Sequence, residues 1–193
     1  NMELGHNVMH GQWDWMNDPE VHSTSWEWDN TGPSAHWKQT HNYIHHKYTN
    51  VLGMDDDVGY GLLRVTRDQR WKPFNLGNPA YNLLLQLFFE YGVALQHLEL
   101  GKVAKGRVPR EEFVQKRREV LEKVGKQIAK DYVMYPALTG PAWKSTLTAN
   151  LAANMIRNVW TNTVIFCGHF PDGADKFTKS DMEGETQGQR YLR

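Results

Sequence analysis

The sequence is short of cysteine and has no excess of charge of either sign, and each shortage excludes a class of protein. Cys167 is the single cysteine among 193 residues, so neither an internal disulfide nor a cysteine-ligated zinc or iron–sulfur site can form. We expect Cys167 to be a small buried apolar residue. The 22 basic and 22 acidic residues balance, which argues against nucleic acid as a partner.

Long uncharged hydrophobic runs are also missing. Two apolar blocks stand out, but Glu90 interrupts residues 80–98, and Lys144 and Arg157 interrupt residues 132–167. Neither block contains the charge-free stretch of about 18 residues that marks a transmembrane helix by itself. Core helices of a soluble all-α protein would have a similar composition. Hydropathy alone therefore leaves membrane insertion open.

Several catalytic motifs are absent as well. The sequence contains no His-Glu-x-x-His motif of zinc proteases, no glycine-rich phosphate loop and no Gly-x-Ser-x-Gly elbow. Soluble di-iron carboxylate bundles need two Glu-x-x-His motifs, and only Glu3–His6 fits that spacing. These classes are therefore disfavoured.

The segment between the apolar blocks, residues 102–130, holds ten Lys and Arg against four Glu. Its apolar residues recur at helical spacing and predict an amphipathic basic helix with a single apolar stripe. The charged face is either solvated or lies on an anionic membrane surface. The predicted stripe consists of Phe113, Val120, Leu121, Val124 and Ile128.

Histidine is what the chain has in plenty, and its spacing is the strongest signal. Two residues four apart share one face of a helix. The nine histidines include two such pairs, His6 with His10 and His41 with His45, and His46 directly follows the second pair. Imidazole suits iron, copper, zinc and nickel, and the number of candidates exceeds what one tetrahedral zinc ion needs. The pattern favours a two-metal site with candidate ligands His6, His10, His41, His45, His46 and His169.

The other three histidines, His22, His36 and His97, are interpreted as solvent-facing or hydrogen-bonded residues. His36 is a possible extra ligand, because it shares a predicted helix, residues 36–50, with His41.

Two of these segments resemble the histidine boxes of membrane fatty-acid desaturases. Residues 5–12 (GHNVMHGQ) resemble the first box, and residues 41–50 (HNYIHHKYTN) resemble the second. Residues 168–171 (GHFP) are similar to the segment that carries an additional histidine ligand before the third box. The third box itself is missing. The resemblance is closest to bacterial, actinobacterial enzymes and covers essentially the whole chain.

The resemblance implies an all-α fold: an integral membrane helical bundle with a cytosolic cap that carries a histidine-rich dimetal site. Residues 1–193 would form one desaturase domain, incomplete at both ends, with membrane-embedded segments 80–98 and 132–167. A piece without the third box is expected to be inactive by itself. The path of the chain stays open: either both segments cross the membrane, or 80–98 dips in and 132–167 forms a short hairpin.

The implied activity is O2-dependent formation of a cis double bond in a long-chain acyl-CoA or acyl-lipid at a non-haem di-iron centre. The six histidines would hold two Fe ions, and O2 would be the co-substrate. Electrons would come from a separate donor, a ferredoxin-like protein or an NAD(P)H flavin reductase. Partners are thus the acyl substrate, the donor and the lipid bilayer, without nucleic acid.

Residues around the boxes are candidates for supporting roles. Asp55, Asp56 and Asp57, just after the second box, could hold ligand histidines by their other ring nitrogen. Asn158 and Asn162 could orient His169. Three tryptophans could form the wall of an acyl tunnel or anchor the chain at the membrane interface, namely Trp26, Trp28 and Trp37.

Three alternatives stay open. A di-iron hydroxylase of alkyl or acyl chains, from the same superfamily, would use the same histidine boxes to deliver oxygen to carbon. A non-catalytic metal-binding membrane protein would hold one weakly bound zinc ion instead. A soluble helical module with structural histidines is a third possibility.

Overall fold

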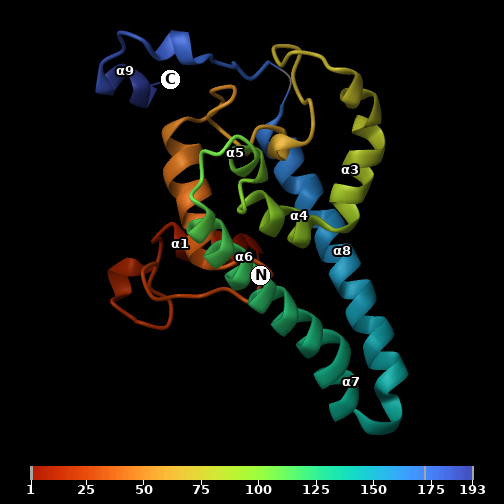
Figure 1. The fold of residues 1–193 in the computed structure, drawn as a ribbon. Helices are drawn as coiled ribbons and strands as arrows, with labels where there is room; N and C mark the ends of the chain where they lie inside the picture. Colours follow the sequence, from red (N-terminus) through yellow and green to blue (C-terminus); the bar gives the residue numbers. More distant parts are fainter. Residues whose placement is uncertain (1, 172, 193) are drawn as a thin grey trace.

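The computed structural model describes residues 2–171 and 173–192, and its regular structure there is helical (Figure 1). The all-α prediction is therefore confirmed. Strand-like pairing in the described residues is limited to one isolated bridge between Val51 and Phe177. The N-terminal half contains α1 (Met2–Met9), η1 (Asp14–Met16), α2 (Ser34–Trp37), η2 (Lys38–His45), η3 (Gly59–Gly61) and η4 (Pro73–Gly77).

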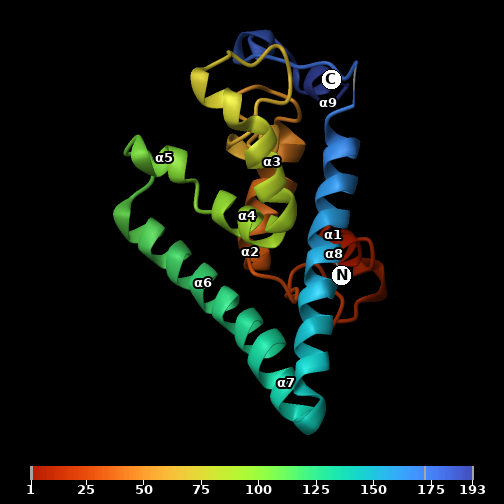
Figure 2. The same cartoon turned by 90° about the vertical axis from the view of Figure 1, so that its right-hand side faces the viewer.

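The C-terminal half holds the longer helices, and two of them form a V (Figure 2). The helix α6 runs down one arm, α8 returns along the other, and a turn at Gly140, with φ of +53°, joins them at the tip. The elements are α3 (Asn78–Leu87), α4 (Phe89–Gln96), α5 (Leu100–Ala104), α6 (Arg110–Ala129), η5 (Lys130–Met134), α7 (Tyr135–Leu138), η6 (Gly140–Ala142), α8 (Trp143–His169), η7 (Lys179–Met182) and α9 (Gln187–Leu192).

The apolar block 80–98 forms two helices rather than one. Phe88 leaves the helical conformation, with φ of −119° and ψ of 35°, and separates α3 from α4. The side chain of Asn158 on α8 bridges the break, because it donates to the Leu87 carbonyl at 3.1 Å and accepts from the Glu90 N–H at 3.4 Å. Backbone groups that the break frees thus find partners inside the protein.

Glu90 is the charged residue within this block, and it is buried against α8. Its carboxylate forms an ion pair with Arg157, and its backbone carbonyl accepts a hydrogen bond from the Thr31 hydroxyl at 2.6 Å. Glu90 interrupts the first apolar block of the sequence and Arg157 interrupts the second, and the fold brings these two charges together. Such pairing reduces the cost of burying each charge.

Small apolar clusters hold the elements together. Leu63, Leu85, Phe89 and Val93 pack between α3, α4 and the loop after η3. Met9, Trp28 and Trp37 join α1 to α2. The third cluster joins α4 to α6 and consists of Ala94, Leu98 and Val120, with Phe113 and Val124 against it.

The predicted basic helix 102–130 exists mainly as α6, but its apolar stripe is narrower than expected. Phe113, Val120 and Val124 face the core, whereas Leu121 and Ile128 are exposed. At 100° per residue the latter two lie about 60–80° away from the line of the other three, beyond the reach of α4. The prediction of a single five-residue stripe was wrong for these two positions.

Part of the basic face of α6 pairs with acids of the protein itself. Lys116 contacts Glu99 and Glu112, each at 2.9 Å, and Lys123 contacts Glu27 at 3.1 Å. No helix in the described residues combines the length and apolarity that a membrane crossing needs. Cys167 is exposed on α8 rather than buried.

Candidate metal centre

Three separate parts of the chain bring the six predicted ligand histidines into ring contact. The helix α1 supplies His6 and His10. The helix η2 supplies His41 and His45, and His46 follows directly after it. His169 is the last residue of α8. Neighbouring ring centroids lie 4.5–5.3 Å apart for the pairs His6–His10, His10–His46, His41–His45 and His45–His169. The sequence-based prediction that these residues act as ligands is therefore compatible with their placement.

The second histidine box lies on a π-helical stretch, which regular helical spacing did not predict. Backbone bonding from i to i+5 widens the turn, so side chains four apart come nearly into line. The rings of His41 and His45 accordingly stack, with centroids 4.9 Å apart and 20° between their planes. Trp37 stacks on the other face of His41, at 4.4 Å.

Close packing of α1 against a tryptophan explains a glycine in the first box. A Cβ atom at Gly5 would lie 2.9 Å from the ring of Trp26. The absence of a side chain there lets α1 approach the loop, so that His6 and His10 reach the other histidines.

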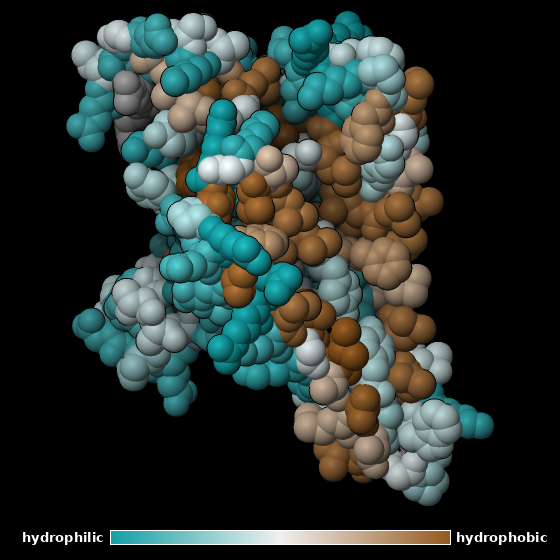
Figure 3. Space-filling view, viewed as in Figure 1, coloured by the Kyte–Doolittle hydropathy of each residue, from teal (hydrophilic) through white to brown (hydrophobic). Residues whose placement is uncertain are grey.

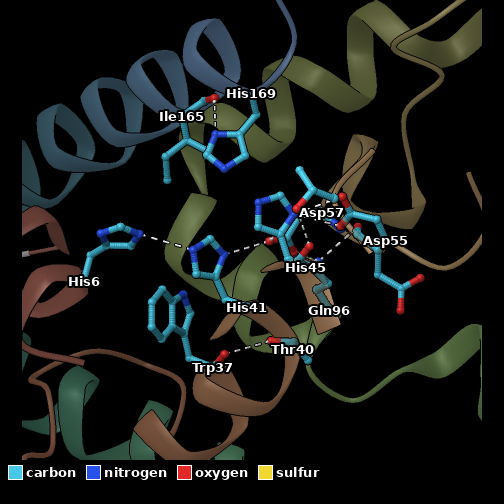
Figure 4. A network of polar contacts seen from close by, with 12 residues as sticks. His6, Trp37, Thr40, His41, His45, Asp55, Asp57, Gln96, Ile165 and His169 are labelled. Carbon is cyan, nitrogen blue, oxygen red and sulfur yellow. Dashed lines mark hydrogen bonds and ion pairs between the residues drawn. The ribbon is translucent and has the colours of Figure 1, made fainter. Parts of the chain in front are cut away.

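Three of the histidines are anchored through the same ring atom (Figure 4). The Nδ1 atom of His41 contacts the Asp57 carboxylate at 2.9 Å, and Nδ1 of His45 contacts Asp55 at 2.9 Å and 3.0 Å. Nδ1 of His169 contacts the Ile165 carbonyl at 3.0 Å. An Nδ1–H donated to oxygen selects the tautomer whose Nε2 lone pair is free, which is the form that binds a metal ion.

The free nitrogens have spacings that suit a shared metal ion. Nε2 of His6 and Nε2 of His41 lie 3.2 Å apart. Two imidazole nitrogens that bind one ion at about 2.0–2.1 Å are separated by about 3.0–3.4 Å. Nε2 of His10 is buried without a hydrogen-bond partner, and ligand atoms of His6, His10 and His41 fall within 4.8 Å of one another. These histidines therefore fit a transition-metal site.

The acidic residues after the second box divide into two roles. The Asp55 side chain is fully buried and also accepts from the backbone N–H groups of Asn50 at 2.9 Å and Asp57 at 3.0 Å. Asp56 points elsewhere and pairs with Lys102 at 3.1 Å. Asp55 and Asp57 contact predicted ligands, whereas Asp56 does not.

Gln96 is a polar residue that sequence reasoning missed. Its amide donates to Asp57 Oδ1 at 2.9 Å and to the Asp56 carbonyl at 3.1 Å. It belongs to an apolar helix 39 residues away along the chain, and no motif or periodicity marks it. Only the fold brings it to the histidines.

The remaining candidates lie away from the cluster. Asn158 binds the α3–α4 break as described, and Asn162 is buried on α8. His36 contacts Glu119 at 2.7 Å, and His97 is buried near it, with ring centroids 6.4 Å apart. His22 contacts Thr24 at 2.9 Å.

Burial and mutual repulsion keep most of the cluster uncharged. Desolvation, followed by the neighbouring histidines, lowers the pKa of His10 to about 4, and burial also lowers the pKa of His6, His46 and His169. His45 is the exception: burial lowers its pKa, but the hydrogen bond to Asp55 and the charges of Asp55 and Asp57 outweigh it and raise the pKa. Neutral imidazoles can bind a metal ion without first losing a proton.

A cavity of about 400 Å³ lies beside the histidines. His6, His41 and His169 line it together with apolar side chains from the loop before α2, from α2, α4 and α8, among them Trp28, Trp37, Phe89, Val93 and Ile165. Two of the three tryptophans predicted to wall a tunnel thus line the cavity. Trp26 packs against the Met9–Trp28–Trp37 cluster instead.

The fold and the cluster define a helical protein with imidazoles arranged for transition-metal ions next to an apolar cavity. The chain belongs to the fatty acid desaturase family, whose sequence pattern it matches over residues 1–181. The resemblance of the histidine boxes is thereby confirmed.

Curated relatives agree with this membership. The chain is 66% identical over 197 aligned residues to NADPH-dependent stearoyl-CoA 9-desaturases of two Mycobacterium tuberculosis strains, covering 100% of this chain and 46% of the relative. It is 32% identical over 118 residues to an sn-1 linoleoyl-lipid 6-desaturase of Synechocystis, covering 56% and 32%. The chain thus spans about half the length of the curated relatives it matches. No solved structure matches it.

Proposed function

We propose that the protein is a fatty-acyl desaturase in which His6, His10, His41, His45, His46 and His169 hold two iron ions. The observation that carries the proposal is the shared anchoring of His41, His45 and His169 through Nδ1, which leaves three Nε2 atoms free beside those of α1. An iron pair supplies the multi-electron reduction of O2 that hydrogen removal from an unactivated methylene requires.

The residues of the chain would supply position and environment. Asp55 and Asp57 hold two imidazoles in one tautomer and orientation, which limits the reorganisation needed during the reaction. Neutral imidazoles add no negative charge to the irons, so the oxidised centre stays electron-poor. The apolar wall formed by Trp37, Phe89, Val93 and Ile165 would bind an acyl chain and exclude water.

The substrate class follows from the cavity and from the relatives. A largely apolar cavity beside the histidines suits a hydrocarbon chain, and the relatives of higher identity are named for stearoyl-CoA. We therefore propose a long-chain acyl-CoA, with an acyl-lipid as the alternative that the Synechocystis relative represents. We also propose a separate electron donor that draws on NADPH, as the names of the mycobacterial relatives suggest.

We further propose that the protein is integral to a membrane, with its metal centre at the cytosolic surface. Apolar side chains gather over α3 and α8 and down to the tip of the V (Figure 3). A contiguous apolar surface of this kind marks an interaction site for protein or lipid. The exposed members on α7 and α8 include Leu138, Trp143, Leu151, Met155, Ile156 and Trp160.

Brominated lipids test the membrane proposal. Bromine on the acyl chains should quench the fluorescence of Trp160, and the Trp160→Phe variant should show less quenching. Trp15→Phe is the matched control, because Trp15 is exposed on η1, far along the chain from α8. Equal quenching of wild type and Trp160→Phe would contradict a lipid-facing α8.

Product analysis tests the activity. The whole protein, supplied with stearoyl-CoA, O2, NADPH and a reductase, should yield a fatty acid two hydrogens lighter by gas chromatography and mass spectrometry. A hydroxylated fatty acid as the main product would assign the hydroxylase reaction instead. Conversion that persists in the His45→Ala variant would exclude the histidine cluster as the active site.

A further inference from the structure

Asp57 has two carboxylate oxygens with different partners (Figure 4). Oδ2 accepts from His41 Nδ1 at 2.9 Å and lies 3.7 Å from His45 Nδ1. Oδ1 accepts from the amide of Gln96 at 2.9 Å, and the same amide donates to the Asp56 carbonyl. The carboxylate is therefore held at both ends, between the second histidine box and the last residue of α4.

A carboxylate in this position has a competing role. Asp and Glu oxygens are themselves good ligands of iron, and Asp57 has ligand atoms within 4.8 Å of those of His41 and His45. Rotation of the Asp57 side chain toward a metal ion would exchange a hydrogen-bond acceptor for an anionic ligand. It would also leave His41 Nδ1 without its partner, and the ring would be free to turn.

The position of Gln96 opposes this rotation. A hydrogen bond to a charged acceptor is stronger than one between neutral groups, and rotation of Asp57 would break it. Because glutamine is neutral, it orients the carboxylate without cancelling its charge, so Asp57 stays a strong acceptor for His41. A lysine or arginine in its place would form an ion pair and compete with His41.

Gln96 can act in this way because α4 is fixed in place. The residues Ala94 and Leu98 on either side of it are buried against α6. At the other end of the helix, Asn158 and Thr31 bind backbone groups of the α3–α4 break. The amide is thus presented by a helix that is held at both ends, rather than by a mobile loop.

We propose that Gln96 is a positioning residue that keeps Asp57 as the hydrogen-bond partner of His41 and outside the coordination sphere of the metal. The inference rests on the proposed metal centre and deepens it, because it makes one amide responsible for the all-histidine ligand set in this part of the site. Gln96 acts only through Asp57, and this is the property that an experiment can isolate.

The test uses cobalt(II) as a spectroscopic probe in the metal-free whole protein. Gln96→Met keeps the size of the side chain and removes the donor, so Asp57 is free to rotate away from His41. Because His41 then loses its outer hydrogen-bond partner, cobalt affinity should fall about 10–100-fold. The visible absorption of bound cobalt should also change, because a carboxylate oxygen enters the ligand set. In an Asp57→Ala background, Gln96→Met should cause no further change in either measurement.

Controls separate this role from a general loss of packing. Gln86→Met alters a glutamine of α3 whose amide contacts Thr163 at 3.2 Å, and it should leave cobalt affinity and spectrum unchanged. Thermal unfolding of the metal-free variants shows whether each still folds. If Gln96→Met does not fold, Gln96→Leu provides a second variant of similar size that also has no donor, and it should weaken cobalt binding in the same direction.

The outcomes separate the two proposals. Unchanged cobalt binding in Gln96→Met, or an equal further loss in the Asp57→Ala background, would overturn the role of Gln96 while the wild-type protein still binds metal and desaturates. Wild-type protein that binds no metal at the histidines would overturn both, because no ligand set would then exist for Gln96 to maintain.

Discussion

At the scale of single residues, Asp55 is the acid on which the second histidine box depends most. Its side chain is inaccessible and accepts hydrogen bonds from His45 and from two backbone N–H groups. Replacement by alanine would leave these buried donors without an acceptor. Each such group costs about 1–3 kcal/mol.

We therefore predict that Asp55→Ala lowers the free energy of unfolding of the metal-free protein by about 3 kcal/mol or more. The neighbouring Asp56→Ala is the control, because Asp56 forms only a partly exposed pair with Lys102 and its loss should cost about 0–1 kcal/mol. Denaturant unfolding followed by tryptophan fluorescence measures both. Similar values for the two variants would show that Asp55 has no special structural role.

The depressed pKa of His10 predicts a pH dependence. Its pKa is about 4 in the folded protein and about 6.5 when unfolded, so between these values the unfolded chain binds more protons. Stability should therefore fall as the pH drops from 6.5 to 4. His6, His46 and His169 contribute in the same direction. The raised pKa of His45 adds a stabilisation that is fully present below pH 6.5 and is lost at higher pH, so it leaves the decline between pH 6.5 and 4 unchanged.

The measurement is the melting temperature of the metal-free protein across that pH range. His10→Gln should give a shallower decline than wild type, because the variant has no group to protonate at that position. A decline of equal slope in the two proteins would rule out His10 as a contributor.

The predicted ligands and the residues that hold them differ in how far sequence reveals them. Ligand histidines occur in short local patterns, so spacing alone identifies His6 with His10 and His41 with His45. Gln96 and the bridging role of Asn158 depend on contacts between segments 39 or more residues apart. A single sequence contains no local signal for such contacts.

At the scale of elements, the break between α3 and α4 links α8 to the metal centre. Asn158 supplies both a donor and an acceptor to backbone groups that Phe88 leaves unpaired. Asn158→Leu would bury these groups without partners. We predict a loss of about 2–4 kcal/mol in unfolding free energy, together with weaker cobalt binding, because α4 carries Gln96.

Thr163→Ala, on the exposed side of the same helix, is the control for Asn158→Leu. Thr163 Oγ1 bonds the Val159 carbonyl within the helix, and its loss should change stability by less than about 1 kcal/mol. Stability and cobalt affinity are measured on both variants. Full cobalt affinity in a destabilised Asn158→Leu protein would show that the break and the metal centre are independent.

Element types were easier to predict than element details. Helical periodicity in 36–50 and 102–130 correctly indicated helix, because 3.6-residue spacing of apolar or histidine residues is a local property. The π-helical stretch at Lys38–His45, the break at Phe88 and the narrow stripe of α6 were not foreseen. Each depends on tertiary contacts that override regular spacing.

At the scale of the whole molecule, polar metal chemistry and apolar surface occupy different parts of the fold. The histidines gather where α1, η2 and the end of α8 meet. Exposed apolar side chains extend along α8 to the tip of the V (Figures 2 and 3). This division is compatible with the membrane-bound desaturase proposed above. The apolar cavity lies between the two regions, lined by residues of both.

If the six histidines hold two iron ions, the metal content of the protein should show it. The whole protein, purified anaerobically in mild detergent, should contain close to two irons per chain by elemental analysis, with a Mössbauer spectrum of coupled ions. The His45→Ala variant should lose them. A single zinc ion that survives His45→Ala would contradict the di-iron account and support the non-catalytic metal-binding function instead.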